Sequence, residues 1–85
     1  MPFKKDLVLV TGAGGHIGTN VVLQLLHAGR NVRATVRKAD DAQRLRAWDC
    51  EVVQGDLTQP FQASAAVKGC NVVYHCAGVS KVFSL

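Results

Sequence analysis

The sequence predicts an α/β fold with β-α-β-α-β-α-β topology and a parallel sheet in the order 3-2-1-4. Two observations lead to this prediction. Short β-rich segments alternate along the chain with segments of helical periodicity, and the connections between them are short. A glycine-rich segment also lies where the first expected strand gives way to the first expected helix. The 85 residues allow one small domain, and no linker or repeat divides residues 1–85.

The first three elements follow from apolar spacing. Leu7–Val10 is a wholly apolar run, which is typical of a strand buried on both faces. Apolar residues then recur at helical spacing over Ile17–Ala28, and Gly29 follows as a stop signal. Val32–Val36 is β-branched and alternating, and this pattern predicts the second strand.

The second half of the chain continues the alternation. Asp40 is expected to cap a second helix that runs to about Trp48, with Gln43 reaching back from the third position. We expect the remaining strand, helix and strand at Glu51–Gln54, about Pro60–Lys68, and Val72–Cys76. This is a partial Rossmann fold, with four of its usual six strands. Because only the third helix covers one face of such a sheet, we expect much of that face to be bare apolar strand.

Composition narrows the class of protein. Ten Lys and Arg against six Asp and Glu give a net charge of +4, which suits an anionic partner. No nucleic-acid motif accompanies the charge, so we expect no nucleic-acid binding. The three cysteines lack C-x-x-C spacing, which favours a reducing compartment. No apolar run reaches the roughly 18–20 residues of a membrane span, and no signal peptide is evident. We therefore expect a cytoplasmic protein without a membrane partner.

The glycine-rich segment carries the strongest functional signal. It contains the pattern G-x-x-G-x-x-G at Gly12, Gly15 and Gly18. The first glycine permits a tight turn, the second lets the backbone approach a pyrophosphate, and the third allows close packing of helix on strand. Free N–H groups in the first helical turn would hold the anion. The expected site residues of this segment are Thr11, Gly12, Gly14, Gly15, His16, Ile17 and Gly18, with His16 contributing its backbone. A Walker-type loop is excluded because no Lys follows.

The pattern Thr11-Gly12-x-x-Gly15-x-x-Gly18 is similar to the fingerprint of the extended and atypical short-chain dehydrogenase/reductases, which include epimerase/dehydratase-like proteins. Three further segments resemble, in order, the second strand, the third-strand end and the fourth strand of the dihydroflavonol reductase-like branch: Val32–Arg37, Gly55–Thr58 and Val72–Gly78. The resemblance spans nearly all of residues 5–80. It implies that residues 1–85 are an N-terminal NAD(P)-binding segment, and that the substrate-binding region lies outside them.

The residues after the second expected strand bear on the choice of nucleotide. An acidic residue there would bind the ribose 2′-hydroxyl of NAD, whereas an Arg accommodates the 2′-phosphate of NADP. Arg37 and Lys38 occupy this place, so we expect NADP(H) rather than NAD. The alternative is that the two form a solvated pair of charges. Asp40 and Asp41 are rival ribose ligands, but their position fits helix capping better.

The family resemblance also assigns roles near the adenosine. Asp56 would accept a hydrogen bond from the adenine amino group, and Leu57 would pack on the ring. Ala77 and Gly78 would line the ribose, where side chains must be small. The alternatives are a turn or capping role for Asp56, and an ordinary strand-ending turn for Ala77 and Gly78.

Catalytic residues are not evident. Reductases of this superfamily use a Tyr-x-x-x-Lys pair, but Gly78 stands four residues after Tyr74, the single tyrosine. Tyr74 is expected to be a packing residue of the fourth strand. His75 and Cys76 would point to opposite faces of that strand, so we assign no metal site. The expected function is NADP(H) binding as part of an oxidoreductase acting on an alcohol, ketone or sugar nucleotide. The alternatives are a non-catalytic dinucleotide-binding module and an inactive truncated product.

Overall fold

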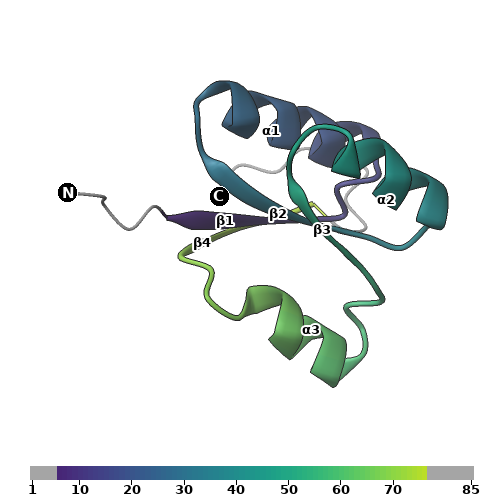
Figure 1. Ribbon diagram of the computed structural model, residues 1–85. Coiled ribbons are helices and arrows are strands. Elements are labelled where there is room, and N and C mark those ends of the chain that lie inside the picture. The colour runs from purple at the N-terminus through teal and green to yellow at the C-terminus, as the bar shows by residue number, and fades with distance from the viewer. Residues whose placement is uncertain (1–5, 77–85) are drawn as a thin grey trace.

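The computed structural model describes residues 6–76 and contains a four-stranded sheet between two layers of helix (Figure 1). The elements are β1 (Leu7–Thr11), α1 (His16–His27), β2 (Asn31–Val36), α2 (Ala39–Arg46), β3 (Glu51–Gln54), α3 (Pro60–Val67) and β4 (Val72–His75). The sheet order is β3-β2-β1-β4, and each neighbouring pair is parallel. The predicted α/β class and strand order are both confirmed.

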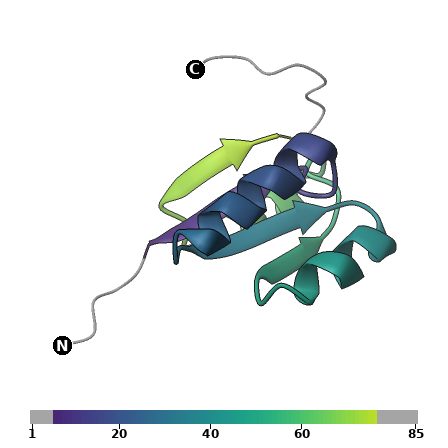
Figure 2. The ribbon, with the colours of Figure 1, turned by 90° about the horizontal axis from the view of Figure 1, so that it is seen from above.

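The main core lies between the sheet and helices α1 and α2, which cover the same face (Figures 1 and 2). Val8 and Val10 point into this core because alternate residues of a strand face the same side. They meet Val22 of α1 and Leu45 of α2, all fully buried. Leu9 points to the other face and is also fully buried, so the central strand β1 is covered on both sides.

Helix α3 is the one helix of residues 6–76 on the other face of the sheet (Figure 1). The strands on this face are only partly covered within residues 6–76, as expected from the strand order. Phe61 of α3 is 91% exposed, and Val73 of β4 is 48% exposed. Both are large apolar side chains, so this side carries exposed apolar surface within residues 6–76.

One predicted helix start is wrong. Helix α2 begins at Ala39, with Lys38 in an extended conformation at its N-cap and no side-chain cap. Asp40 therefore lies in the first turn and does not cap the helix with Gln43. The acidic residues Asp40 and Asp41 still suit this turn, because carboxylates are stabilised by the positive end of the helix dipole. The helix ends at Arg46, two residues before the expected end.

Candidate functional site

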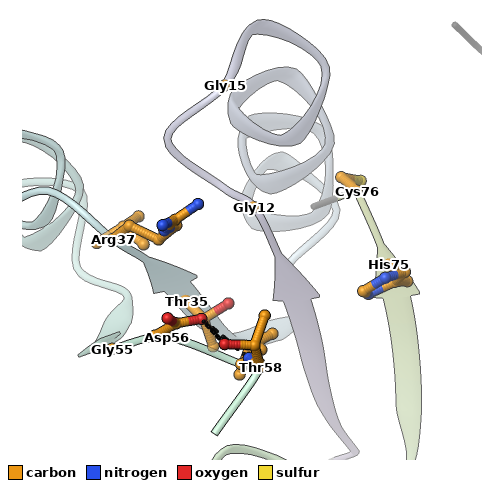
Figure 3. Close-up of a pocket in the computed structure, with 11 residues that line it drawn as sticks. Gly12, Gly15, Thr35, Arg37, Gly55, Asp56, Thr58, His75 and Cys76 are labelled. Carbon is orange, nitrogen blue, oxygen red and sulfur yellow. Dashed lines mark hydrogen bonds between the residues drawn. The ribbon is translucent and has the colours of Figure 1, made fainter. Parts of the chain in front are cut away.

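A cavity of about 580 Å³ opens at the carboxyl ends of the strands (Figure 3). Its walls come from the β1–α1 loop, the end of β2, the β3–α3 loop and the end of β4. The lining residues are Gly12, Gly15, Thr35, Val36, Arg37, Gly55, Asp56, Leu57, Thr58, His75 and Cys76. The strand order reverses between β1 and β4, so the cavity lies at the topological switch point where open α/β sheets bind ligands.

The three glycines of the loop are held by different constraints. Gly12 has a φ of 64°, a left-handed conformation that disfavours a side chain. A Cβ built on Gly18 would collide with the carbonyl oxygen of Gly12, so α1 packs directly on the loop. A Cβ on Gly15 would lie 3.6 Å from that same oxygen, an ordinary van der Waals contact. The packing of the protein itself therefore leaves room for a side chain at Gly15.

Several backbone N–H groups of the loop are available to a ligand. Gly15 N–H donates to Gly12 O at 3.2 Å, and Thr19 N–H donates to Gly15 O at 2.9 Å. Within residues 6–76, no acceptor is found for the N–H groups of Gly14, His16, Ile17 and Gly18. Three of these belong to the first turn of the 12-residue helix α1, where the helix dipole also favours an anion.

The ends of β1 and β4 are joined by Thr11, which is 3% exposed. Its Oγ1 lies 2.7 Å from His75 Nδ1 and accepts the Cys76 N–H at 3.0 Å. Burial raises the pKa of the Cys76 thiol, so the thiol stays protonated at neutral pH. Thr11 thus fixes the strand ends beneath the cavity, and Cys76 presents an uncharged group to it.

Asp56 begins the turn that leads from β3 to α3. Its Oδ1 accepts the Thr58 hydroxyl at 2.7 Å and the Thr58 N–H at 2.9 Å. The hydroxyl bond and then the N–H bond lower the pKa of the Asp56 carboxyl, and Arg37 adds a smaller effect in the same direction. The turn role of Asp56 is thus present. Its second oxygen, Oδ2, has no hydrogen-bond partner in the described part of the chain and remains available at the cavity.

Arg37 follows the last residue of β2 and is exposed. Its side chain extends from the strand end towards the loop that carries Gly12 and Gly15 (Figure 3). Lys38 is also exposed, but it lies at the N-cap of α2 and does not line the cavity. Of the two basic residues, Arg37 is therefore the one that lines the cavity.

The structure brings together only some of the expected site residues. Five line the cavity: Gly12, Gly15, Arg37, Asp56 and Leu57. Six do not line it, although all but Lys38 belong to the glycine-rich segment: Thr11, Gly14, His16, Ile17, Gly18 and Lys38. Ala77 and Gly78 lie outside the described residues.

Four lining residues with polar or sulfur-containing side chains were missed from the sequence: Thr35, Thr58, His75 and Cys76. Strand alternation combined with the sheet order could have found two of them. Thr35 lies near the carboxyl end of β2, and His75 is paired in register with Thr11. The functional residues of such a sheet gather at this edge.

Tyr74 lies on the side of β4 that faces α1, away from the cavity. It is 42% exposed and lines a shallow groove with Ile17, Val21 and other residues of α1. Within residues 6–76, no group of three His, Cys, Asp or Glu side chains could hold a metal ion. No helix in the same region is long and apolar enough to cross a membrane.

Comparison with known proteins decides the family. The NAD(P)H-binding family model matches residues 12–84, which is most of the chain. The chain belongs to this NAD(P)H-binding family. Its relatives place it in the extended short-chain dehydrogenase/reductase superfamily. Dihydroflavonol 4-reductase of Zea mays is 36% identical over an alignment of 87 positions, gaps included, which covers 87% of this chain and 23% of the maize protein.

Solved structures share the fold of this NAD(P)H-binding chain. A short-chain dehydrogenase/reductase superfamily protein of Agrobacterium tumefaciens with bound NAD matches with a TM-score of 0.70 and 30% identity, over 88% of this chain and 21% of that one. AtPrR2 with NADP+ and (+)-pinoresinol matches with a TM-score of 0.74 and 27% identity, over 91% and 28%. The chain spans about a fifth to a quarter of the length of the curated relatives that it matches.

Proposed function

We propose that the chain binds NADP(H) in the cavity at the carboxyl ends of the strands, as the N-terminal cofactor-binding segment of a reductase. The observation that carries this proposal is a group of four N–H groups that are unpaired within residues 6–76, beside a glycine that the protein's own packing does not require. Backbone donors at a helix N-terminus are suited to a pyrophosphate. The family match supports a nicotinamide dinucleotide as the ligand.

The proposed binding mode places the adenine against the cavity wall and the pyrophosphate on N–H groups next to the lining residues Gly12 and Gly15. The N–H groups of Gly14, His16, Ile17 and Gly18 hold the pyrophosphate, with Gly15 leaving room for it. Asp56 Oδ2 accepts a hydrogen bond from the adenine amino group, while Oδ1 keeps its hydrogen bonds from Thr58. Leu57 packs on the adenine ring. Ala77 and Gly78 line the ribose. The adenine role of Asp56 and Leu57 and the ribose role of Ala77 and Gly78 rest on the family resemblance alone.

Arg37 supports NADP(H) over NAD(H). Its guanidinium can donate two parallel hydrogen bonds to a 2′-phosphate, and Lys38 adds positive charge nearby. The rival ribose ligands are less suitable. Asp41 accepts a hydrogen bond from Arg44 at 3.0 Å, and neither Asp40 nor Asp41 lines the cavity.

The chemistry of the proposed reductase is divided between this chain and a region outside it. When bound, the nicotinamide supplies hydride transfer. The residues of this chain bind and orient the dinucleotide, since residues 1–85 contain no Tyr-x-x-x-Lys pair. The substrate class that we propose is an alcohol, a ketone or a sugar nucleotide. A second candidate is a non-catalytic dinucleotide-binding module, which that missing pair favours.

The proposal is tested by calorimetric titration of the purified chain with NADPH and, separately, NADH. We expect tighter binding of NADPH. Arg37→Asp should remove most of this preference, because a carboxylate repels the 2′-phosphate and can accept a ribose hydroxyl. Arg46→Asp, an exposed charge reversal on α2, is the matched control and should keep the preference. A folded chain that binds neither dinucleotide would contradict the proposal.

A further inference from the structure

The side chain of Arg44, on helix α2, is hydrogen-bonded to the glycine loop. Its Nη2 donates to Gly14 O at 3.3 Å, and its Nη1 lies 3.5 Å from Thr19 Oγ1. Thr19 Oγ1 in turn donates to Ala13 O at 2.7 Å. Two successive carbonyl groups of the loop, those of Ala13 and Gly14, are thus held by side chains from α1 and α2.

Holding these carbonyls sets the direction of the loop's N–H groups. In a planar trans peptide the C=O group and the following N–H group point in opposite directions. With Ala13 O held by Thr19, the N–H of Gly14 points away from Thr19 and stays free for a ligand. With Gly14 O held by Arg44, the N–H of Gly15 points back to Gly12 O, its partner at 3.2 Å.

The Arg44 side chain is itself fixed in place. Asp41 Oδ1 accepts a hydrogen bond from its Nη2 at 3.0 Å, and its guanidinium carbon lies 5.7 Å from the centre of the Trp48 ring. Asp41 also packs directly on the loop, because a Cβ on Gly14 would collide with its carboxylate. The side chains of Arg44 and Asp41 are 41% and 26% exposed, so the contact is partly shielded from water.

We propose that Arg44 is a positioning residue that holds the glycine loop in the conformation that presents its N–H groups to a pyrophosphate. This inference rests on the proposed function. Without Arg44 the loop samples other conformations, and a dinucleotide must then order it on binding. Because NADPH and NADH share the pyrophosphate, the loss of Arg44 should weaken both by the same factor. Arg37, in contrast, should affect NADPH selectively.

The test compares Arg44→Ala and Arg44→Lys with Arg46→Ala, a control at an exposed position of the same helix. Arg44→Lys keeps the charge but replaces the planar fork with a single point of donation. We expect both Arg44 variants to weaken NADPH and NADH about tenfold, as for the loss of one hydrogen bond from a charged donor. Without cofactor, hydrogen exchange of the Gly15 amide should be faster in both variants than in the control.

Four results would overturn the inference. A loss confined to NADPH would mean that Arg44 contacts the 2′-phosphate, and full recovery in Arg44→Lys would mean that charge alone matters. Exchange and affinities equal to those of Arg46→Ala, in a wild-type chain that binds, would remove the positioning role and leave the proposed function intact. A folded wild-type chain that binds neither dinucleotide would instead remove the proposed function, and this inference with it.

Discussion

At the scale of single residues, two glycines of the same loop should respond differently to one added methyl group. Gly18→Ala should destabilise the fold by about 1–3 kcal/mol, because the Cβ collides with the Gly12 carbonyl. Gly15→Ala should change the free energy of unfolding by less than about 1 kcal/mol, since the added methyl group finds room and the backbone is extended. Its cofactor affinity should nevertheless fall at least about tenfold.

Urea unfolding and calorimetric titration of both variants check this pair of predictions. The two measurements separate loss of fold from loss of ligand. A Gly15→Ala chain that is stable and binds normally would show that the pyrophosphate does not approach this glycine.

Asp56 makes a pH-dependent contribution to the stability of the folded chain. Its pKa is lowered in the folded chain by the hydrogen bonds from Thr58, so in acid the unfolded state binds more protons than the folded state. The stability that it contributes is present above its ordinary pKa of about 3.9 and is lost as the pH falls through the lowered value. Urea unfolding at pH 6 and at successively lower pH should therefore show that the wild type loses its stability advantage over Asp56→Asn as the pH falls. A difference that stays constant with pH would contradict this role.

At the scale of elements, the attachment of α3 depends on one strand residue. Arg33 of β2 donates to Ala66 O at 2.8 Å and Lys68 O at 2.7 Å, and it pairs with Glu51 at 2.7 Å. Its side chain is only 14% exposed. The guanidinium thus satisfies carbonyl groups at the end of a helix that has no basic residue in its last turn.

Arg33→Ala should destabilise the chain by about 1.5–3 kcal/mol, because it leaves these acceptors and Glu51 without their charged partner. Thermal or urea unfolding measures the effect. Arg30→Ala is the matched control, since Arg30 is exposed and its side chain has no partner among residues 6–76. Equal stability of the two variants would show that Arg33 does not hold α3.

The parts of the fold that could be predicted are those that depend on residues close together in the sequence. Each strand was predicted to within a residue or so, because apolar runs and glycine stops are properties of neighbouring residues. The start of α2 was not, because Asp40 and Gln43 form a capping pattern that the backbone does not use. The contacts of Arg33 and Arg44 join segments far apart in the chain or on different elements, and no spacing rule describes them.

At the scale of the whole molecule, the side of the sheet that carries α3 retains exposed apolar surface. Phe61 is 91% exposed, so Phe61→Ser should change the free energy of unfolding by no more than about 0.5 kcal/mol. It should also reduce self-association, measured by sedimentation, because it removes an exposed aromatic group. Leu9→Ala, at a fully buried site, should cost about 2–5 kcal/mol in comparison. Unchanged self-association in Phe61→Ser would exclude this residue as a contact.

The site was predictable in outline for a reason that belongs to the whole sheet. A parallel sheet in the order 3-2-1-4 brings the loops after β1 and β3 to one edge, so Gly12, Gly15 and Asp56 meet there. His75 and Thr35 were missed because their place in the cavity depends on register and strand direction. These are set by tertiary pairing, not by local pattern.

The most direct test of dinucleotide binding at the carboxyl ends of the strands is NMR titration of the ¹⁵N-labelled chain with NADPH. We expect the largest amide shifts at Gly14, His16, Ile17 and Gly18, whose N–H groups are unpaired within residues 6–76. Shifts should also occur at Asp56 and Leu57. The chemical shifts of amides at the amino ends of the strands, such as Asn31, should not change. Shifts centred on the amino ends of the strands, or none in a folded chain at saturating NADPH, would contradict a dinucleotide site at the carboxyl ends.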